Sequence, residues 1–340
     1  MGNSVVLDVQ DLTISFRSDG KEVPAVENIS FQLNKGEILG IVGESGSGKS
    51  LTSLSIMGLL PKPPAIVDSA SSVIFNGEDL LNFSEAKMRK IRGNQISMIF
   101  QEPMTSLNPL FTVGQQMMEA YLLHHDTNKK KAFAECVAML KLVGLPRAES
   151  MMKNYPHELS GGMRQRVMIA MSMVCQPNIL IADEPTTALD VTIQAQILKL
   201  MKDLNEKTDT SIILITHDLG VVAEVCDRVL VMYAGKIVEK GSVRDIFKNP
   251  KHPYTKGLLK SVPDIRQKDS KLYSIPGNVP KPGTIDNGCV FAPRCEYAMP
   301  ACGTVSPALQ KVSSEGQMVR CLLYQGEGGE AAHGGAVIKG

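Results

Sequence analysis

The sequence has almost no net charge and no long apolar run. Its 36 basic and 35 acidic residues leave a formal charge of +1 at pH 7, so the overall balance does not favour nucleic acid or an anionic membrane surface as a partner. No apolar run approaches the roughly 18 residues that a membrane-spanning helix needs, and the first ten residues lack the basic and then apolar order of a secretory signal. These absences predict a cytoplasmic chain that meets its partners through local sites.

Cysteine is scarce, and its seven copies fall into two groups. Three lie in apolar patterns with helical spacing and are predicted to be buried thiols: Cys136, Cys175 and Cys226. Four gather near the end of the chain: Cys289, Cys295, Cys302 and Cys321. In a reducing compartment such a group favours metal binding over disulfides.

What the chain does have is a 43% hydrophobic content, enough for a substantial core in its 340 residues. Residues 7–16 alternate as half-buried strands do, and Asp19-Gly20 follows with turn chemistry, which predicts an antiparallel entry sheet. Short apolar runs, typical of strands buried on both faces, occur at residues 38–42, 96–100, 179–182 and 212–215. Helical patterns lie between them, so the sequence predicts an α/β fold with a mostly parallel sheet.

The pattern changes at two places along the chain. The segment from about residue 103 to 172 is rich in methionine and lacks strand alternation, which predicts an inserted helical subdomain. Prolines thicken after residue 250, so we place a domain boundary there, between residues 1–250 and a smaller module over 251–325. Residues 326–340 are glycine-rich, and we expect them to form a disordered tail.

A glycine-rich loop follows the strand expected at residues 38–42 and opens a helical stretch. It reads Gly43-Glu-Ser-Gly-Ser-Gly-Lys-Ser50, and strand, loop and helix in this order make it a phosphate-binding loop rather than an ordinary turn. Its glycines let backbone N–H groups point at phosphate oxygens. Lys49 is expected to neutralise the β and γ phosphates of a nucleotide, and Ser50 to bind Mg²⁺. The predicted nucleotide contacts in this loop are Gly43, Ser45, Gly46, Gly48, Lys49 and Ser50.

Polar residues end three other buried strands. Asp183 is expected to hold Mg²⁺ at the edge where the ligand crevice of an open α/β sheet lies, and Glu184 to polarise the attacking water. His217 is a candidate sensor of the γ-phosphate, and Gln101 is placed to touch Mg²⁺ and the nucleophilic water. Each would be ambiguous alone, and their meaning comes from the phosphate loop.

A second anion-binding helix start occurs at Leu159-Ser-Gly-Gly-Met163. One protomer cannot easily apply both elements to one nucleotide, whereas two protomers arranged head to tail can. Here the sequence resembles the ATP-binding cassette (ABC) family, whose signature is this LSGG element. The resemblance implies a P-loop NTPase cassette with a RecA-like core, an antiparallel β subdomain and a helical subdomain, and two ATP molecules held between two cassettes.

Further roles follow from that resemblance. Residues predicted to meet the ATP of the opposite cassette are Ser160, Gly161, Gly162 and Asp190, the last in an Ala188-Leu189-Asp190 run at the dimer seam. Phe16 resembles the aromatic residue that stacks on adenine, with a core-facing strand residue as the alternative.

Three segments sharpen the match toward one branch of the family. Residues 100–109, 249–259 and 275–280 resemble the ATPases of oligopeptide, dipeptide and nickel importers. The resemblance implies peptide import driven by ATP hydrolysis, with the chain peripheral on the inner face of the membrane. The implied partners are two permeases, a second identical or sister ATPase and an external solute-binding protein, with no nucleic acid. Nickel or another small solute is the alternative cargo. A soluble ABC ATPase of translation or DNA repair is the alternative class, against which stand the single cassette and the near-neutral charge.

The spacing of the four C-terminal cysteines matches neither a zinc ribbon nor a ferredoxin run, so chemistry alone leaves the metal open. The peptide-importer ATPases carry a stretch similar to residues 288–295, and the resemblance implies a 4Fe–4S cluster bound by Cys289, Cys295, Cys302 and Cys321. Structural zinc and free thiols are the alternatives.

Overall fold

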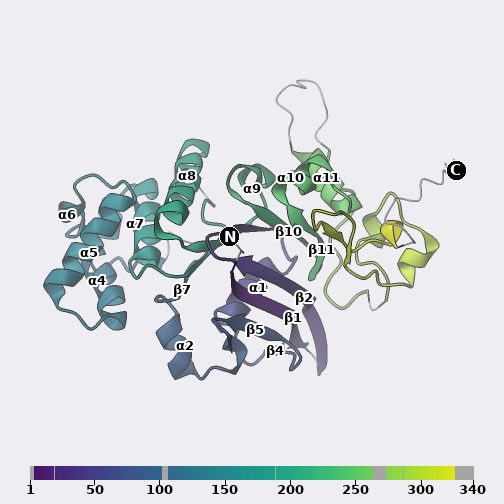
Figure 1. Cartoon of the computed structure of the whole chain (residues 1–340), viewed down its shortest axis with the longest axis horizontal. Helices are drawn as coiled ribbons and strands as arrows, with labels where there is room; N and C mark the ends of the chain where they lie inside the picture. Colours follow the sequence, from purple (N-terminus) through teal and green to yellow (C-terminus); the bar gives the residue numbers. More distant parts are fainter. Residues whose placement is uncertain are drawn as a thin grey trace.

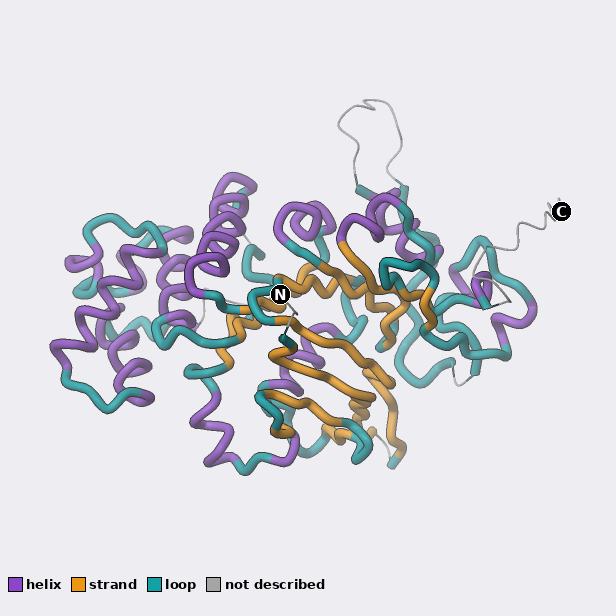
Figure 2. Tube along the Cα trace, viewed as in Figure 1, coloured by secondary structure: helices purple, strands orange, loops and turns teal. Residues whose placement is uncertain are grey.

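An eight-stranded sheet forms the centre of the described structure (Figures 1 and 2). The computed structural model describes residues 4–325 except 19, 102–105, 188, 263–272 and 286. The strand order is β12-β13-β11-β10-β3-β9-β8-β7. The strands are β3 (Ile38–Val42), β7 (Ile96–Ile99), β8 (Ile179–Asp183), β9 (Ser211–Thr216), β10 (Arg228–Tyr233), β11 (Lys236–Ser242), β12 (Gln310–Lys311) and β13 (Met318–Val319). Strands β7, β8, β9, β3 and β10 run parallel, which confirms the predicted α/β class.

The central strands are apolar throughout because both faces of the sheet are covered. Side chains of a strand alternate between the two faces; along β8, Ile179 and Ile181 enter one core cluster, whereas Leu180 and Ala182 enter the other. One cluster lies under helices and the other under a second sheet. The four strands expected from apolar runs are therefore present, within a residue or two of their predicted ends.

The N-terminal residues form this second sheet. Strands β1 (Val5–Ser18) and β2 (Lys21–Asn34) pair antiparallel, and β1 also pairs with β4 (Ala65–Val67) and β5 (Ser72–Phe75); β6 (Glu78–Asp79) completes it. The entry sheet is thus antiparallel as predicted. Asp19 of the predicted turn lies outside the described residues.

Helices α4 to α7 stand at one end of the molecule's long axis, and the segment after residue 250 stands at the other (Figure 1). Among the described residues between 106 and 173 there are helices and no strand, as expected for the insert. The helices are α1 (Lys49–Ile56), α2 (Glu85–Ile91), α4 (Val113–His124), α5 (Lys129–Leu142), α6 (Ala148–Met151), α7 (Gly161–Met173), α8 (Val191–Thr208), α9 (Leu219–Val225), α10 (Val243–Lys248) and α11 (Pro253–Ser261). In the part of the chain that the structure describes, none is long and apolar enough to cross a membrane.

The C-terminal segment adds two strands to the main sheet. β13 pairs with β11, and β12 pairs with β13. Beyond α11, the other described residues of this segment are loop and short 3₁₀ helix at Ala292–Arg294, Pro300–Gly303 and Leu322–Tyr324. The division of the chain at residue 250 stays a prediction, and the predicted tail over 326–340 lies outside the described residues.

A buried carboxylate joins this segment to the sheet. Glu239 of β11 is 0% exposed, and its carboxylate accepts hydrogen bonds from the N–H of Lys251 (2.7 Å) and of His252 (2.9 Å) and from Nε2 of Gln317 (2.8 Å). Burial raises the pKa of Glu239, and these donors oppose the rise. One side chain therefore ties the start of α11 and the residue before β13 to the same strand.

We predict that Glu239→Ala destabilises the chain by about 2–4 kcal/mol, because it leaves several buried donors without an acceptor. Denaturant unfolding of the purified chain measures this. Glu206→Ala, on the exposed face of α8, is the matched control and is expected to change the free energy of unfolding by less than about 0.5 kcal/mol. An equal effect of the two substitutions would contradict the role of Glu239.

Candidate functional site

The phosphate loop joins β3 to α1, as its sequence predicts. Gly48 precedes α1 with φ 100°, a backbone conformation that favours glycine. At Gly43 the constraint is space, because an added Cβ would lie 2.2 Å from the carbonyl oxygen of Met232 on β10. The loop can therefore run this close to β10 only with glycine at both positions.

Lys49 lies folded into this loop. Its side-chain Nζ donates to the carbonyl oxygens of Gly43 (2.8 Å) and Glu44 (3.0 Å) and lies 3.4 Å from Oγ of Ser47. Burial lowers the pKa of Lys49, while the charges of Glu184, Asp183 and Glu44 raise it. Its ammonium thus closes the loop and faces the carboxylates that end β8.

Asp183 and Ser50 supply hard oxygen atoms next to this lysine. Asp183 ends β8 and is 3% exposed, and its Oδ1 is buried with no hydrogen-bond partner. Burial raises the pKa of Asp183, and a hydrogen bond with the side chain of Ser50 opposes the rise. An orphaned carboxylate oxygen beside a hydroxyl fits Mg²⁺, which prefers oxygen ligands.

Glu184 is held in a strained backbone position. Its φ is 47°, uncommon for a residue other than glycine, and its N–H donates to the carbonyl of Ile215 on β9 (2.9 Å). Its Oε1 lies 3.2 Å from Nδ1 of His217, and its Oε2 accepts from Oγ1 of Thr187 (3.0 Å). Partial burial acts to raise the pKa of Glu184, but the hydrogen bonds from His217 and Thr187 and nearby positive charge lower it. The carboxylate therefore stays ionised, as a base that orients water must be.

Gln101 and Phe16 are two further predicted site residues. Gln101 is exposed, two residues beyond the end of β7. Phe16 on β1 is half-buried and packs against the core between the two sheets. Stacking of Phe16 on adenine stays a prediction beside its alternative as a core residue.

The signature residues stand at the start of α7. Ser160 caps this helix, because its side chain accepts a hydrogen bond from the N–H of Met163 (3.4 Å). Gly162 packs against Ile193 at the start of α8, and a Cβ added at Gly162 would lie 3.2 Å from the Ile193 side chain. Asp190 caps α8 through the N–H of Ile193 (2.9 Å). Within the described residues, no hydrogen bond or ion pair joins Ser160, Gly161 or Gly162 to the phosphate loop. Ala188 of the predicted dimer seam lies outside the described residues.

One buried contact links the signature helix to the water-orienting end of β8. Nε2 of Gln165 on α7 donates to the carbonyl of Pro185, directly after Glu184. The start of α7 and the catalytic candidates are therefore parts of one packed unit.

Comparison with known proteins identifies the arrangement. Residues 26–187 match the family model described as "ABC transporter", and residues 238–302 match that described as "Oligopeptide/dipeptide transporter, C-terminal region". The oligopeptide transport ATP-binding protein AppD of Bacillus subtilis is 54% identical over 328 residues, which cover 96% of this chain and 99% of AppD. The chain belongs to the ABC transporter ATPases of the oligopeptide/dipeptide type.

Other members of the ABC family agree with this assignment. The oligopeptide transport ATP-binding protein OppD of Salmonella typhimurium is 51% identical over 94% of each chain. The solved dimeric structure of MJ0796, described as a bacterial ABC transporter cassette, superposes with a TM-score of 0.61 at 28% identity. That match covers 70% of this chain and 99% of MJ0796.

The predicted four-cysteine metal site is not assembled in this ABC ATPase. Cys289, Cys295, Cys302 and Cys321 all line one small cavity of about 10 Å³. Among the described residues, however, no group of three or more His, Cys, Asp or Glu side chains is placed to hold a metal ion. Burial raises the pKa of Cys295 to about 11 and of Cys321 to about 12.

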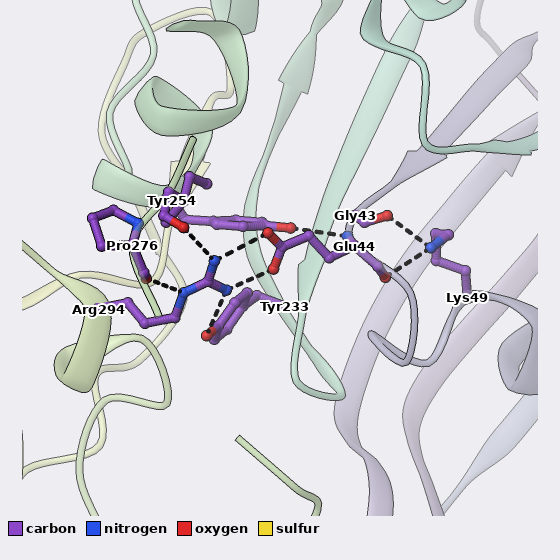
Figure 3. Close-up of polar contacts among 8 residues, drawn as sticks. Gly43, Glu44, Lys49, Tyr233, Tyr254, Pro276 and Arg294 are labelled. Carbon is purple, nitrogen blue, oxygen red and sulfur yellow. Dashed lines mark hydrogen bonds and ion pairs between the residues drawn. The ribbon is translucent and has the colours of Figure 1, made fainter. Parts of the chain in front are cut away.

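Sequence reasoning missed Glu44 and Arg294. Arg294 comes from the C-terminal segment and forms an ion pair with Glu44 inside the phosphate loop (Figure 3). The signal was present at Glu44, because a carboxylate in a loop that binds anions needs a neutralising partner. Nothing in the sequence indicated which of the 36 basic residues would provide it.

We predict that Glu184→Gln retains ATP binding but lowers ATP turnover by about 10²–10⁴-fold, because the amide cannot act as a base. Steady-state phosphate release and equilibrium ATP binding measure the two quantities. Glu224→Gln, an exposed change on α9, is the control and should leave both unchanged. Near-normal hydrolysis by Glu184→Gln would overturn the role of Glu184.

Proposed function

We propose that this ATPase powers the import of oligopeptides or dipeptides through partner permeases in the cell membrane. The observation that carries the proposal is the near full-length identity to AppD and OppD, both described as oligopeptide transport proteins. The match of residues 238–302 to the oligopeptide/dipeptide transporter region supports the same cargo class. Nickel or another small solute is the alternative cargo, and no relative named above favours it.

We further propose that two cassettes close around two ATP molecules. Lys49 neutralises the phosphates and Asp183 and Ser50 hold Mg²⁺, which would offset phosphate charge when bound. Glu184, oriented by His217, accepts a proton from the attacking water. Ser160, Gly161, Gly162 and Asp190 act on the ATP of the opposite cassette. The dimeric solved structure of MJ0796 supports this arrangement, as do the two separate anion-binding helix starts.

The helical insert is the proposed contact with the permeases. It exposes large apolar side chains, with Leu110 78% and Leu123 77% exposed. A groove of about 390 Å³ lies between α4 and α5 near Met118, Leu122 and Phe133. Exposed apolar patches of this kind mark interaction surfaces, and this one would place the chain on the inner face of the membrane.

The Glu184→Gln form, held with ATP and Mg²⁺ and extracted in mild detergent from membranes of its host, tests the proposed function. We expect mass spectrometry to find two polytopic permeases, a cassette partner and a peptide-binding protein. The same preparation without ATP is the control for nucleotide-dependent assembly. Recovery of ribosomal or DNA-repair proteins with no membrane protein would overturn the proposal.

The four cysteines support a narrower proposal, a 4Fe–4S cluster with zinc as the alternative. Its support is that all four thiols line one cavity. Protein purified without oxygen is expected to contain about four iron atoms and four sulfides per chain. The Cys289→Ser variant is expected to lose this iron and sulfide. Cys136→Ser, a buried thiol in α5, is the control. Iron-free protein without sulfide would refute the cluster.

A further inference from the structure

Glu44 places a negative charge inside a loop built to bind phosphates. Its carbonyl oxygen accepts from Nζ of Lys49 (3.0 Å), so its main chain is part of the phosphate cradle. An uncompensated carboxylate there would repel phosphate oxygens, because like charges at short range are unfavourable. In Figure 3 the Glu44 side chain extends away from Lys49 toward Arg294. The loop therefore depends on what holds and neutralises that carboxylate.

Arg294 engages both carboxylate oxygens of Glu44. Its Nη1 lies 2.6 Å from Oε2 and its Nη2 3.2 Å from Oε1, the bidentate geometry that suits a guanidinium. The Arg294 side chain is only 5% exposed and that of Glu44 30%. A pair this sheltered is weakly screened by solvent and salt.

The remaining donors of Arg294 fix its position. Its Nε donates to the carbonyl of Pro276 (2.8 Å), its Nη2 to that of Ile275 (3.2 Å), and its Nη1 to the hydroxyl of Tyr233 (3.3 Å). These contacts hold the guanidinium in place independently of Glu44. The C-terminal segment and β10 thus preorganise the Arg294 guanidinium for its contact with Glu44.

The main chain of Glu44 is held from the same side. Its N–H donates to the hydroxyl of Tyr254 (2.9 Å), which is 0% exposed. The Tyr254 ring packs against Tyr233 and Phe291 with centroid distances of 4.6 and 5.4 Å. Residues outside the phosphate motif therefore fix Glu44 at both its backbone and its side chain.

We propose that Arg294 is a positioning residue of the ATP site, which neutralises Glu44 and holds its carboxylate away from the phosphate face of the loop. Arg294 acts through Glu44 and is not a catalytic residue. The proposal goes beyond the proposed transport function, because it concerns ATP binding by the cassette whatever the cargo.

A structural ion pair that only attaches the C-terminal segment makes a different prediction. If Arg294 only attaches the segment, removing the charge of Glu44 as well cannot restore the ATP affinity that is lost with Arg294. If Arg294 compensates Glu44, the second substitution removes the repulsion. The double variant therefore separates the two roles.

Equilibrium binding of a non-hydrolysable ATP analogue with Mg²⁺ to the purified full chain is the test. Arg294→Met is expected to weaken binding about tenfold, equal to about 1.4 kcal/mol. Glu44→Gln combined with Arg294→Met should return affinity to within about threefold of the unchanged chain. Arg294→Lys keeps the charge and should lose less than Arg294→Met. In the assembled transporter, Arg294→Met should raise the KM for ATP with kcat nearly unchanged.

Arg320→Met is the matched control. Arg320 also lies in the C-terminal segment and donates to main-chain carbonyls, those of Ile237 (3.0 Å) and Pro307 (3.2 Å), and these hydrogen bonds do not involve the phosphate loop. The Arg320→Met substitution should leave ATP affinity unchanged. Thermal unfolding is recorded for every variant. Unchanged affinity in Arg294→Met, or a double variant as weak as the single one, would overturn the proposal. Failure of the unchanged chain to bind ATP would instead refute the ATP site itself.

Discussion

The site depends on one constraint: the C-terminal ends of the parallel strands in the central sheet are aligned with one another. Val42 at the end of β3 pairs with Thr216 of β9, and Asp183 at the end of β8 pairs with Ile215. This register brings the phosphate loop, the two carboxylates at the end of β8 and His217 to one edge, although they are far apart in the sequence. A slip of one residue would exchange the side chains that the two faces receive, so the close packing of the two core clusters keeps the site residues together.

Assembling charges at this edge costs stability, and the local contacts offset that cost. Lys49 and Asp183 are both buried, and the raised pKa of Asp183 and the lowered pKa of Lys49 express the penalty of removing each charge from water. The backbone strain at Glu184 adds about 1–3 kcal/mol to the cost. The network among Lys49, Glu184 and His217 persists because packing on both faces of the sheet enforces it, and it leaves a buried oxygen of Asp183 available for a cation.

The sequence predicted what is local and failed where distant segments meet. The phosphate loop, the carboxylates after β8 and the LSGG helix start each carry their own strand or helix context, so their positions followed from short-range patterns. The pairing of β13 with β11 could not be predicted, because a two-residue strand is too short to show an alternation of apolar and polar residues. The cysteine spacing predicted a metal site, yet spacing along a loop does not set whether the sulfur atoms converge, and the structure leaves them around a cavity without a ligand set.

The contact between Glu44 and Arg294 shows why the C-terminal segment is more than an appendage. Glu239 ties this segment to β11, and Tyr254 and Arg294 then reach from α11 and the 3₁₀ turn at Ala292–Arg294 to the phosphate loop. Two of the four cysteines, Cys289 and Cys295, flank that same turn, whose main-chain hydrogen bonds run from Ala292 to Cys289 and from Cys295 to Ala292. These two cysteines therefore lie directly beside the turn that carries Arg294. The C-terminal segment is therefore in direct contact with the phosphate loop, through Tyr254 and Arg294.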